Sequence, residues 1–281
     1  ADQPMRSTTE NAQLALLFEV SGTPKPGNVD REREYPDLRF EHFVCGAVCA
    51  RDGLHHAASG GDVGESFRRA VAGMSQQSGG NTQFGALLLL TPLVRAAATD
   101  SLSPAGAGAV VDETTVGDTV GFYEACEYVD VAVDEPPEEM EPLDVRRGEA
   151  AVPAVRNRGV TLGELMADSA DRDGIAREWT TGFPRTFDAA EHLEALDGAV
   201  TDRAATVYLD ALATAIDTFV VTKHGRETAL EVKRRAGAVR DGEEDVTAFA
   251  EELIERGINP GTTADIVAGA LFVAFERGLE V

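Results

Sequence analysis

Apolar residues recur along most of this chain at the spacing expected on one face of an α-helix. Leu14, Leu17 and Phe18 show this spacing near the N-terminus, and Phe249 and Leu253 continue it near the other end. Sustained alternation of apolar and polar residues, which would indicate a half-buried strand, is hard to find. The pattern therefore predicts an all-α fold.

Signals for helix starts agree with this pattern. Ser7 with Glu10, and Thr161 with Glu164, have the spacing of a capping box, in which two side chains satisfy the exposed backbone amides of a helix. We expect a bundle of about ten helices. Their predicted ranges are residues 7–20, 37–51, 63–77, 82–98, 116–128, 161–171, 185–197, 201–220, 224–237, 243–256 and 262–278.

Two stretches interrupt the helical pattern. Residues 100–115 are rich in Gly, Ala and Ser, and residues 134–158 contain four prolines and several acidic residues. Both are expected to be surface connections, and a short strand at 129–133 would not change the class. Because a chain of 281 residues can bury one large core and shows no repeat period, we expect a single domain over residues 1–281 with a loop-borne active site.

The composition is strongly acidic. There are 49 Asp and Glu residues against 25 Lys and Arg residues, which gives a net charge of −24, and only Lys25, Lys223 and Lys233 are lysines. The carboxylates are spread through helical segments, which indicates an acidic, halophilic surface in molar salt, where the Debye length is about 3 Å. Nucleic acid is disfavoured as a partner, because its phosphates require a concentrated basic patch.

The chain is expected to be cytoplasmic. Its three cysteines are an odd set in a long chain, which fits reduced thiols better than disulfides. Cys45 and Cys49 lie one helical turn apart, but buried thiols are a commoner outcome than a metal site. No leader precedes the first helix, and no apolar run reaches the roughly 20 residues of a membrane span. No membrane partner is expected, and the sequence leaves the oligomeric state open.

The first irregular loop, TPKPGNVD at residues 23–30, can present polar side chains to a ligand. Its prolines restrict the backbone, and Gly27 allows close backbone approach, so Lys25, Asn28 and Asp30 could meet a phosphate or a sugar. The alternative is an ordinary turn, since most loops rich in Pro and Gly are only turns.

A pair of carboxylates follows this loop. Asp37 and Glu41 are four residues apart on one helix face, with Arg39 and His42 nearby, as a magnesium site or an acid and base pair requires. The alternative is a solvated surface, which is common in so acidic a chain.

Two later loops lead into strongly apolar helices. In GGNTQFG, at residues 79–85, unpaired first-turn amides beside Asn81 and Thr82 could cradle an anion. In INPGTTAD, at residues 258–265, Asn259 and Gly261 precede Asp265, which could hold a magnesium ion that bridges to phosphates. In both loops the alternative is that the polar residues only cap the helix.

The segment DTFVVTKHGRE, at residues 217–227, gathers cations in a chain that otherwise avoids lysine. Asp217 begins it, and Lys223, His224 and Arg226 follow. The alternative is a set of exposed cations that interact only with a helix dipole. Signatures of the common hydrolases and nucleotide-binding folds, including the Walker and Rossmann glycine motifs, are absent from the sequence.

Together these segments resemble the triphosphoribosyl-dephospho-CoA synthase family. TPKPGNVD with an acidic and aromatic stretch, NT before a Gly and an apolar helix, DT before a short loop, and NPGTTAD occur in the family's order across nearly the whole chain. The central segment AREWTTGFPRTFD, at residues 176–188, and Gln83 after the NT pair depart from the family pattern. These departures place the chain in a divergent, archaeal-like branch and leave the acceptor open.

The resemblance implies an all-helical enzyme that moves the 5-triphosphoribosyl group of ATP to the 2′-hydroxyl of 3′-dephospho-CoA, or of a related cofactor precursor, and releases adenine. It also implies Mg²⁺ as cofactor, with carboxylates stabilising an oxocarbenium-like transition state. The residues that these roles imply are, for catalysis, Asp30, Asp37 and Glu41; for metal binding, Asp265 and Asp217; and for substrate binding, Lys25, Gly27, Asn28, Arg39, Asn81, Thr82, Lys223, His224, Arg226, Asn259 and Gly261.

Two alternatives stay open at this point. The same helical scaffold could carry a hydrolase that acts on a ribosyl or phosphate compound, or it could be a non-catalytic nucleotide-binding protein whose motif loops are only helix caps. The transferase and the hydrolase both require the motif loops to meet at one cleft, whereas the binding protein allows them to lie apart.

Overall fold

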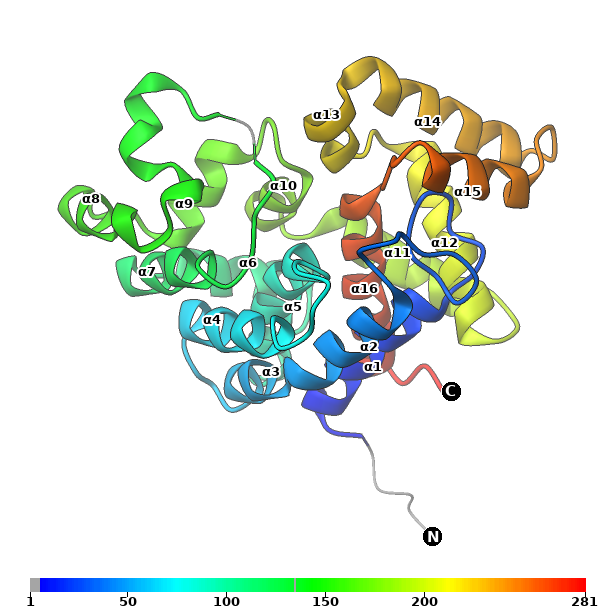
Figure 1. Cartoon of the computed structure of the whole chain (residues 1–281). Coiled ribbons are helices and arrows are strands. Elements are labelled where there is room, and N and C mark those ends of the chain that lie inside the picture. The colour runs from blue at the N-terminus through cyan, green and yellow to red at the C-terminus, as the bar shows by residue number, and fades with distance from the viewer. Residues whose placement is uncertain (1–5, 134) are drawn as a thin grey trace, which may run out of the picture.

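The computed structural model describes residues 6–133 and 135–281, and this part of the chain is helical without any strand (Figure 1). The all-α prediction is confirmed. The helices in chain order are α1 (Thr8–Ser21), α2 (Phe40–Cys49), α3 (Arg51–Ala58), α4 (Val63–Met74), α5 (Phe84–Ala97), α6 (Pro104–Asp112), α7 (Val116–Ala125), the 3₁₀ helices η1 (Glu138–Leu143) and η2 (Val145–Ala151), α8 (Val152–Arg158), α9 (Leu162–Ser169), α10 (Gly174–Thr181), α11 (Pro184–Ala195), α12 (Val200–Thr214), α13 (Thr218–His224), α14 (Arg226–Arg240), α15 (Val246–Glu255) and α16 (Gly261–Glu276).

Helices α5 and α16 form the centre of the fold. Both are apolar around their whole circumference, as expected for helices enclosed by others, and α16 is buried along almost all of its length. Helix α16 packs against α1, α5, α11 and α12, while α3 and α4 cover another side of α5. One large hydrophobic cluster joins these helices.

The sequence underestimated the number of helices. The stretch at 100–115 contains α6, whose N-cap Ser103 accepts a hydrogen bond from the amide of Gly106, and the stretch at 134–158 contains η1, η2 and α8. The expected helix at 201–220 is two helices, because the chain turns at the cap residue Asp217. Residues 174–181, which were not predicted to be helical, form α10. Residues 129–133 form no strand.

Two groups of helices rise on either side of the central pair. One contains α7 to α10 with η1 and η2, and the other contains α13 to α15 (Figure 1). Helices α5 and α16 both begin at the space between these groups, since Gly85 and Gly261 line the same cavity there. The positive ends of two helix dipoles therefore face one region.

Within the described residues, no single helix has both the length and the apolar character needed to cross a membrane. The pair formed by α12 and α13 meets these criteria only when joined, across a bend of 63°.

Candidate active site

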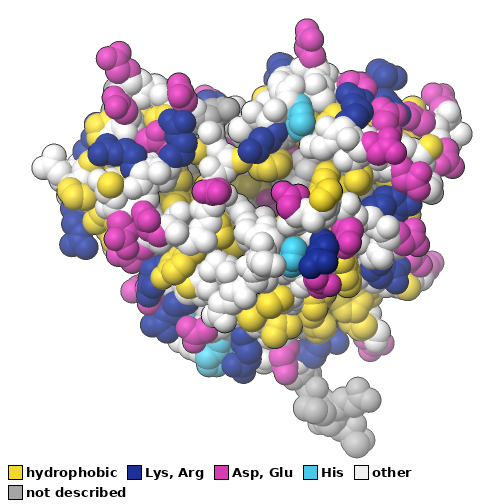
Figure 2. All heavy atoms as spheres, in the orientation of Figure 1, with side chains coloured by type: hydrophobic (Ala, Val, Ile, Leu, Met, Phe, Trp, Pro, Cys, Tyr) yellow, Lys and Arg dark blue, Asp and Glu magenta, His cyan; other side chains and the backbone are white. Residues whose placement is uncertain are grey.

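A cavity of about 260 Å³ opens between the two groups of helices. Figure 2 shows the molecule hollowed at this place, with hydrophobic side chains at the bottom of the hollow. Its walls come from α1, the motif loops at residues 23–30, 79–85 and 258–265, helices α9, α10 and α13, and the segment at residues 131–145. The motif segments, which are far apart in sequence, therefore meet at this cavity. The segment at residues 217–227 also reaches it, but through Thr218 rather than through Asp217.

Three carboxylates face one end of the cavity. Glu19 comes from α1, Asp173 from the start of α10, and Asp265 from the first turns of α16. Burial raises the pKa of each of them above its usual value. The negative charges of Glu19, Asp217 and Asp173 raise the pKa of Asp265 further, which marks this end of the cavity as a place where negative charge accumulates.

Asp265 lies against the start of α5. Its carboxylate accepts a hydrogen bond from the backbone amide of Ala86, which lowers its pKa and partly opposes the effect of burial. A Cβ atom at Gly85 would lie only 2.0 Å from Oδ2 of Asp265, so any side chain at this position would displace the carboxylate. The position of Asp265 in the INPGTTAD motif therefore requires a glycine at residue 85, the last residue of the GGNTQFG motif.

A buried ion pair forms the neighbouring wall. Lys25 is 0% exposed, and its Nζ donates to the carboxylate of Glu19 and to Oδ1 of Asn28, the latter at 3.0 Å. The amide nitrogen of Asn28 in turn donates to Oδ1 of Asn259 at 2.8 Å. Glu19, Asn28 and Asn259 line the cavity, whereas Lys25 lies behind them.

Close backbone packing holds the first and last motif loops together. Gly27 has a φ of +75°, and a Cβ atom there would lie 2.2 Å from the carbonyl oxygen of Ile258. The hydroxyl of Tyr35 donates to the carbonyl of Gly27 at 2.6 Å, and the hydroxyl of Tyr208 donates to the carbonyl of Pro26 at 2.9 Å. Gly27 therefore permits the junction of two loops and does not line the cavity.

The three residues predicted for catalysis lie away from the cavity wall. Asp30 is 1% exposed and accepts hydrogen bonds from the amides of Lys25, Glu32 and Arg33, so it organises its own loop. Asp37 is exposed and precedes α2. Asp37 and Glu41 therefore do not lie on one face of the same helix, because only Glu41 belongs to α2.

Glu41 and Arg39 form an exposed pair at the start of α2. Their side chains are 66% and 46% exposed and lie 2.5 Å apart, and neither lines the cavity. Nδ1 of the buried His42 accepts a hydrogen bond from the backbone amide of Arg39, which closes the first turn of α2.

Asn81 and Thr82 both line the cavity. The carbonyl oxygen of Asn81 accepts from the amide of Phe84 at 3.1 Å, so this residue also caps α5. Thr82 donates to the side-chain oxygen of Gln83 at 3.3 Å. Asn81 and Asp265 already engage two of the first amides of α5, which leaves less of this helix end for an anion than the sequence indicated.

The segment at residues 217–227 begins beside the wall of the cavity and ends at the surface of the molecule. Asp217 is 1% exposed, and its oxygens accept from the amide of Val220 and from both the amide and the hydroxyl of Thr263. It ties α13 to α16 behind the wall, where its charge acts on Asp265.

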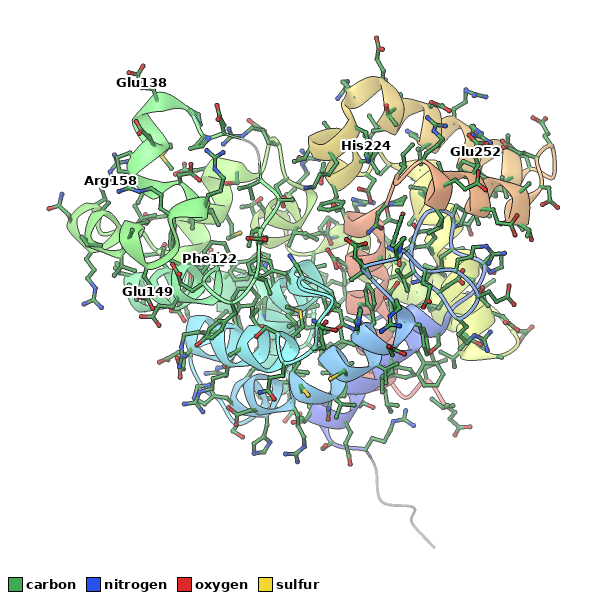
Figure 3. All side chains as sticks on the ribbon, viewed as in Figure 1. Phe122, Glu138, Glu149, Arg158, His224 and Glu252 are labelled. Atoms are coloured by element: carbon green, nitrogen blue, oxygen red, sulfur yellow. The ribbon has the colours of Figure 1, made fainter. Side chains whose placement is uncertain are left out.

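The cations of this segment lie at the end of α13 and at the start of α14. Lys223 lies over the ring of Phe219 at 5.9 Å, and Nε2 of His224 is 3.0 Å from the carbonyl of Gly257. Both are exposed, as is Arg226, and none of the three lines the cavity. Figure 3 labels His224 where α13 meets α14.

Comparison with known proteins points to the same family as the motifs. The sequence matches the profile of the CitG family, ATP:dephospho-CoA triphosphoribosyl transferase, over residues 5–280. The chain belongs to this family. A crystal structure from Archaeoglobus fulgidus, assigned provisionally as a triphosphoribosyl-dephospho-CoA synthase, has a TM-score of 0.67 and 25% identity to this chain, covering 83% of it and 98% of the other. Among the curated proteins compared, none matches.

Membership of the CitG family makes the protein an ATP-dependent transferase and confirms the resemblance drawn from the four motif loops. The family match does not depend on the residues that sequence reasoning chose inside those loops. Their roles stay predictions, which the geometry of the cavity now sharpens.

Several cavity residues were missed from the sequence. Glu19 is the clearest case, because a carboxylate among the apolar positions of α1 is a signal that could have been noticed. Arg172 is the only cation among the described residues that line the cavity, and its guanidinium has no hydrogen bond or ion pair within the described chain. Asp173 and Phe219 also line the cavity, and the sequence analysis gave neither of them a role.

The other end of the cavity is apolar. Phe122 and Leu88 form part of it, together with aliphatic and thioether side chains from two helices and the segment at residues 131–145, among them Leu165 and Met166. The ring of Phe122 packs against Phe67 and Phe84 in the core beneath (Figure 3). The cavity thus has one acidic end and one mainly apolar end, and Asp144 and Asp168 also line it.

The donor set at the acidic end suits a magnesium ion shared with a substrate. Within the described residues, no group of three or more His, Cys, Asp or Glu side chains is arranged to hold a metal by itself. Mg²⁺ usually needs only one or two carboxylates, since phosphate oxygens and waters complete its octahedral shell. Asp265 and Asp173 both line the cavity with carboxylate oxygens, the ligand type that Mg²⁺ prefers, so they fit this type of site.

Proposed function

We propose that this cavity is the active site in which the 5-triphosphoribosyl group of ATP is moved to the 2′-hydroxyl of 3′-dephospho-CoA with release of adenine. The observation that carries the proposal is the convergence on one cavity of polar residues from distant segments, among them Glu19, Asn28, Asn81, Asp173 and Asp265. The convergence argues against helix caps that are merely structural, because such caps have no reason to share a cavity.

The acidic end suits the reacting sugar. Cleavage of the bond between C1′ and N9 of ATP develops positive charge on the ribosyl ring, and carboxylates fixed in a site of low dielectric stabilise such charge. Asp265 is held by the amide of Ala86 and by the close approach of Gly85, so it needs little reorganisation during the reaction. Asn28 and Asn81 lie nearby with polar groups that can orient hydroxyls of the ribose.

The triphosphate requires positive charge in a cavity that has little of its own. Asp265 and Asp173 are the residues that would hold Mg²⁺, which would neutralise phosphate oxygens when bound. Arg172 adds a guanidinium that has no hydrogen-bond or ion-pair partner among the described residues, a group that binds phosphate well. This assignment replaces Lys25, Lys223 and Arg226 as the direct phosphate ligands.

The apolar end suits the acceptor. Of the two substrates, only dephospho-CoA carries a long uncharged arm, and the aliphatic and methionine side chains around Leu165 and Met166 can adapt to such a chain. We therefore place the arm of the acceptor at the apolar end and its ribose next to the acidic end. The family match supports dephospho-CoA itself over a different cofactor precursor.

Adenine release tests the function. The purified protein is incubated with ATP, Mg²⁺ and 3′-dephospho-CoA, and free adenine and the mass of the coupled product are measured by chromatography. Asp265→Asn should lower the rate by about 10²–10³-fold, the usual cost of removing one group that stabilises transition-state charge. Asp171→Asn, an exposed aspartate near the cavity that does not line it, serves as the matched control.

Each other outcome has a defined meaning. Formation of ADP, or of no product, rejects the transferase. Adenine formed equally well without an acceptor indicates a hydrolase on the same scaffold. We also propose a cytoplasmic setting and highest activity in molar KCl, because the three cysteines are unpaired and the acidic surface is screened by salt.

A further inference from the structure

Lys25 is the only lysine in its motif, yet it has no access to a ligand. Its side chain is completely buried, lies 5.7 Å from the ring centroid of Tyr208, and ends between Glu19 and Asn28. The backbone amide of Lys25 donates to Oδ2 of Asp30 at 3.0 Å, so the loop is fixed at this residue as well. Any effect of Lys25 on a substrate must therefore pass through a neighbour.

Glu19 is the neighbour that reaches the cavity. It is 4% exposed, and it lines the acidic end of the cavity from the last turns of α1. Its contact with Lys25 sets the direction of the carboxylate, and Asn28 limits the movement of Lys25 in turn. A carboxylate held at one place by a buried cation is prepared to accept a proton without a change of shape.

We propose that Glu19 is the catalytic base that takes the proton from the acceptor hydroxyl, and that Lys25 is a positioning residue that holds Glu19 for this step. The inference rests on the proposed function and adds the identity of its base. The acceptor oxygen forms a bond to C1′ of ATP, and the bond from C1′ to N9 breaks with its electron pair left on adenine. The hydroxyl proton passes to Glu19, and an equivalent proton from solvent neutralises adenine.

The other carboxylates of the region are less suited to this role. Asp30 and Asp217 already accept several hydrogen bonds and do not line the cavity. Asp265 and Asp173 each accept a backbone amide, from Ala86 and Ala176, and are the pair assigned to the metal. Asp144 also lines the cavity, but its partner Arg146 is 44% exposed, so among the described lining carboxylates only Glu19 is paired with a buried cation.

The charged and titratable groups around Glu19 come from three elements, the loop at residues 23–30 and helices α12 and α16. Lys25 favours its ionised form, and Asp30 from the same loop opposes it. From α16 the carboxylate of Asp265 repels it, and from α12 the hydroxyl of Tyr208 lies in its field. Burial outweighs the attraction of Lys25 and raises the pKa of Glu19, so the loss of Lys25 would leave nothing to hold the charge there.

A double-mutant cycle on kcat tests the proposal. Glu19→Gln keeps an oxygen that can accept from Lys25, and it should lower kcat by roughly 10²–10⁴-fold, the range of general base catalysis, with little change in KM for ATP. Lys25→Met should lower kcat by at least about tenfold. The kcat of the double variant should lie within about threefold of the kcat of Glu19→Gln, because the effects on kcat of residues that act as one unit are not additive. Lys233→Met on α14 is the matched control.

Two kinetic results would overturn the inference. The first is Glu19→Gln with kcat within about threefold of the parent protein, and the second is a loss from Lys25→Met that multiplies fully on top of the loss from Glu19→Gln. If Lys25→Met does not fold, the neutral double variant and Glu19→Gln still give the decisive comparison.

An independent measurement separates this inference from the proposed function. Carbon NMR of glutamate labelled at its carboxyl carbon should find Glu19 ionised at pH 7.5 in the parent protein and protonated in Lys25→Met. Equal ionisation in both proteins would refute the positioning role of Lys25, whatever the enzyme assay gives. Failure of the parent protein to release adenine would instead reject the proposed function, while this measurement still decides whether Lys25 controls Glu19.

Discussion

Two charged clusters of this protein use the same types of residue in opposite surroundings. The buried pair consists of Lys25 and Glu19, which are 0% and 4% exposed beside the cavity. The surface cluster joins α14 and α15 on the outside of the molecule, where Glu252 is labelled in Figure 3. Its members are Glu231, Arg235, Glu244, Glu252 and Arg256.

The two clusters show that burial, not the number of ion pairs, decides what a charged contact does. In the surface cluster, hydrogen bonds from Arg235 and then from Arg256 lower the pKa of Glu252 to about 2. In the buried pair, the loss of hydration outweighs the attraction of Lys25, and the pKa of Glu19 is raised. Water therefore stabilises the charges of the surface cluster, whereas in the buried pair each charge depends on its ion-pair partner and, for Lys25, also on Asn28.

The largest effect on stability should come from breaking the buried pair. Lys25→Met leaves Glu19 buried without a cation, so Glu19 has to take up a proton on folding, and we expect the free energy of unfolding to fall by about 3–5 kcal/mol. Urea unfolding followed by circular dichroism measures the loss. Lys233→Met, a change of the same chemistry on the partly exposed side of α14, should alter stability by less than about 0.5 kcal/mol. Similar losses for both variants would contradict the comparison.

The second effect should be a recovery. Adding Glu19→Gln to Lys25→Met replaces the group that has to be protonated on folding with a neutral amide, and we expect the double variant to regain about 2 kcal/mol or more of the loss. The same unfolding assay measures it, with Glu19→Gln alone completing the cycle. A double variant less stable than Lys25→Met would show that Glu19 and Lys25 stabilise the fold independently.

Much of this site could be predicted from the sequence. The loops at residues 23–30, 79–85 and 258–265 stand out because Pro and Gly interrupt apolar helices, and a loop at the start of a buried helix has to lie at the end of that helix. The structure brings these loops together, so Asn28, Asn81 and Asp265 line the cavity as expected.

Local pattern could not show which polar side chain of a loop reaches the cavity. Lys25 looked like a phosphate ligand because it lies in an irregular loop with Pro and Gly, yet its side chain donates to the carboxylate of Glu19 from α1. Asp37 and Glu41 looked paired because they are four residues apart, but α2 begins only at Phe40. Both errors concern the direction of a side chain, which depends on contacts between distant segments.

The missed helices have a similar cause. Residues 138–158 carry prolines and charges that weaken the helical pattern, but tertiary contacts stabilise short helices there. The hydroxyl of Tyr123 on α7 donates to the carbonyl of Leu143, and the carboxylate of Glu127 accepts the amide of Glu149 at 2.8 Å. Propensity is a weak prior where such contacts are available.

A smaller effect should follow from a change in the surface cluster. Arg235→Met removes the ion pairs to Glu244 and Glu252 and the contact of the guanidinium with the ring of Phe249, whose centroid is 4.6 Å away. We expect a loss of about 1–2 kcal/mol in dilute buffer. Thermal unfolding in dilute buffer and in 1 M KCl should show that part of the loss disappears with salt, since screening at about 1 M acts within about 3 Å. The loss caused by Lys25→Met should change much less with salt.

The smallest effect is a difference in the sign of the pH dependence. The pKa of Glu252 is lowered from 4.5 to about 2, so its contribution is present above pH 4.5 and is lost as the pH falls toward 2. Its side chain is 40% exposed, so we expect less than about 1 kcal/mol. The pKa of Glu19 is raised above 4.5, so its contribution is complete below that pH and is lost as the pH rises through the raised value.

Unfolding of Glu252→Gln and Glu19→Gln across pH 3–8 compares these signs directly. Relative to the parent protein, Glu252→Gln should be less stable at neutral pH and should approach it in acid. Glu19→Gln should instead gain relative stability as the pH rises. Parallel curves for the two variants would mean that Lys25 keeps Glu19 as strongly ionised as Arg235 and Arg256 keep Glu252, and burial would then no longer distinguish the two clusters.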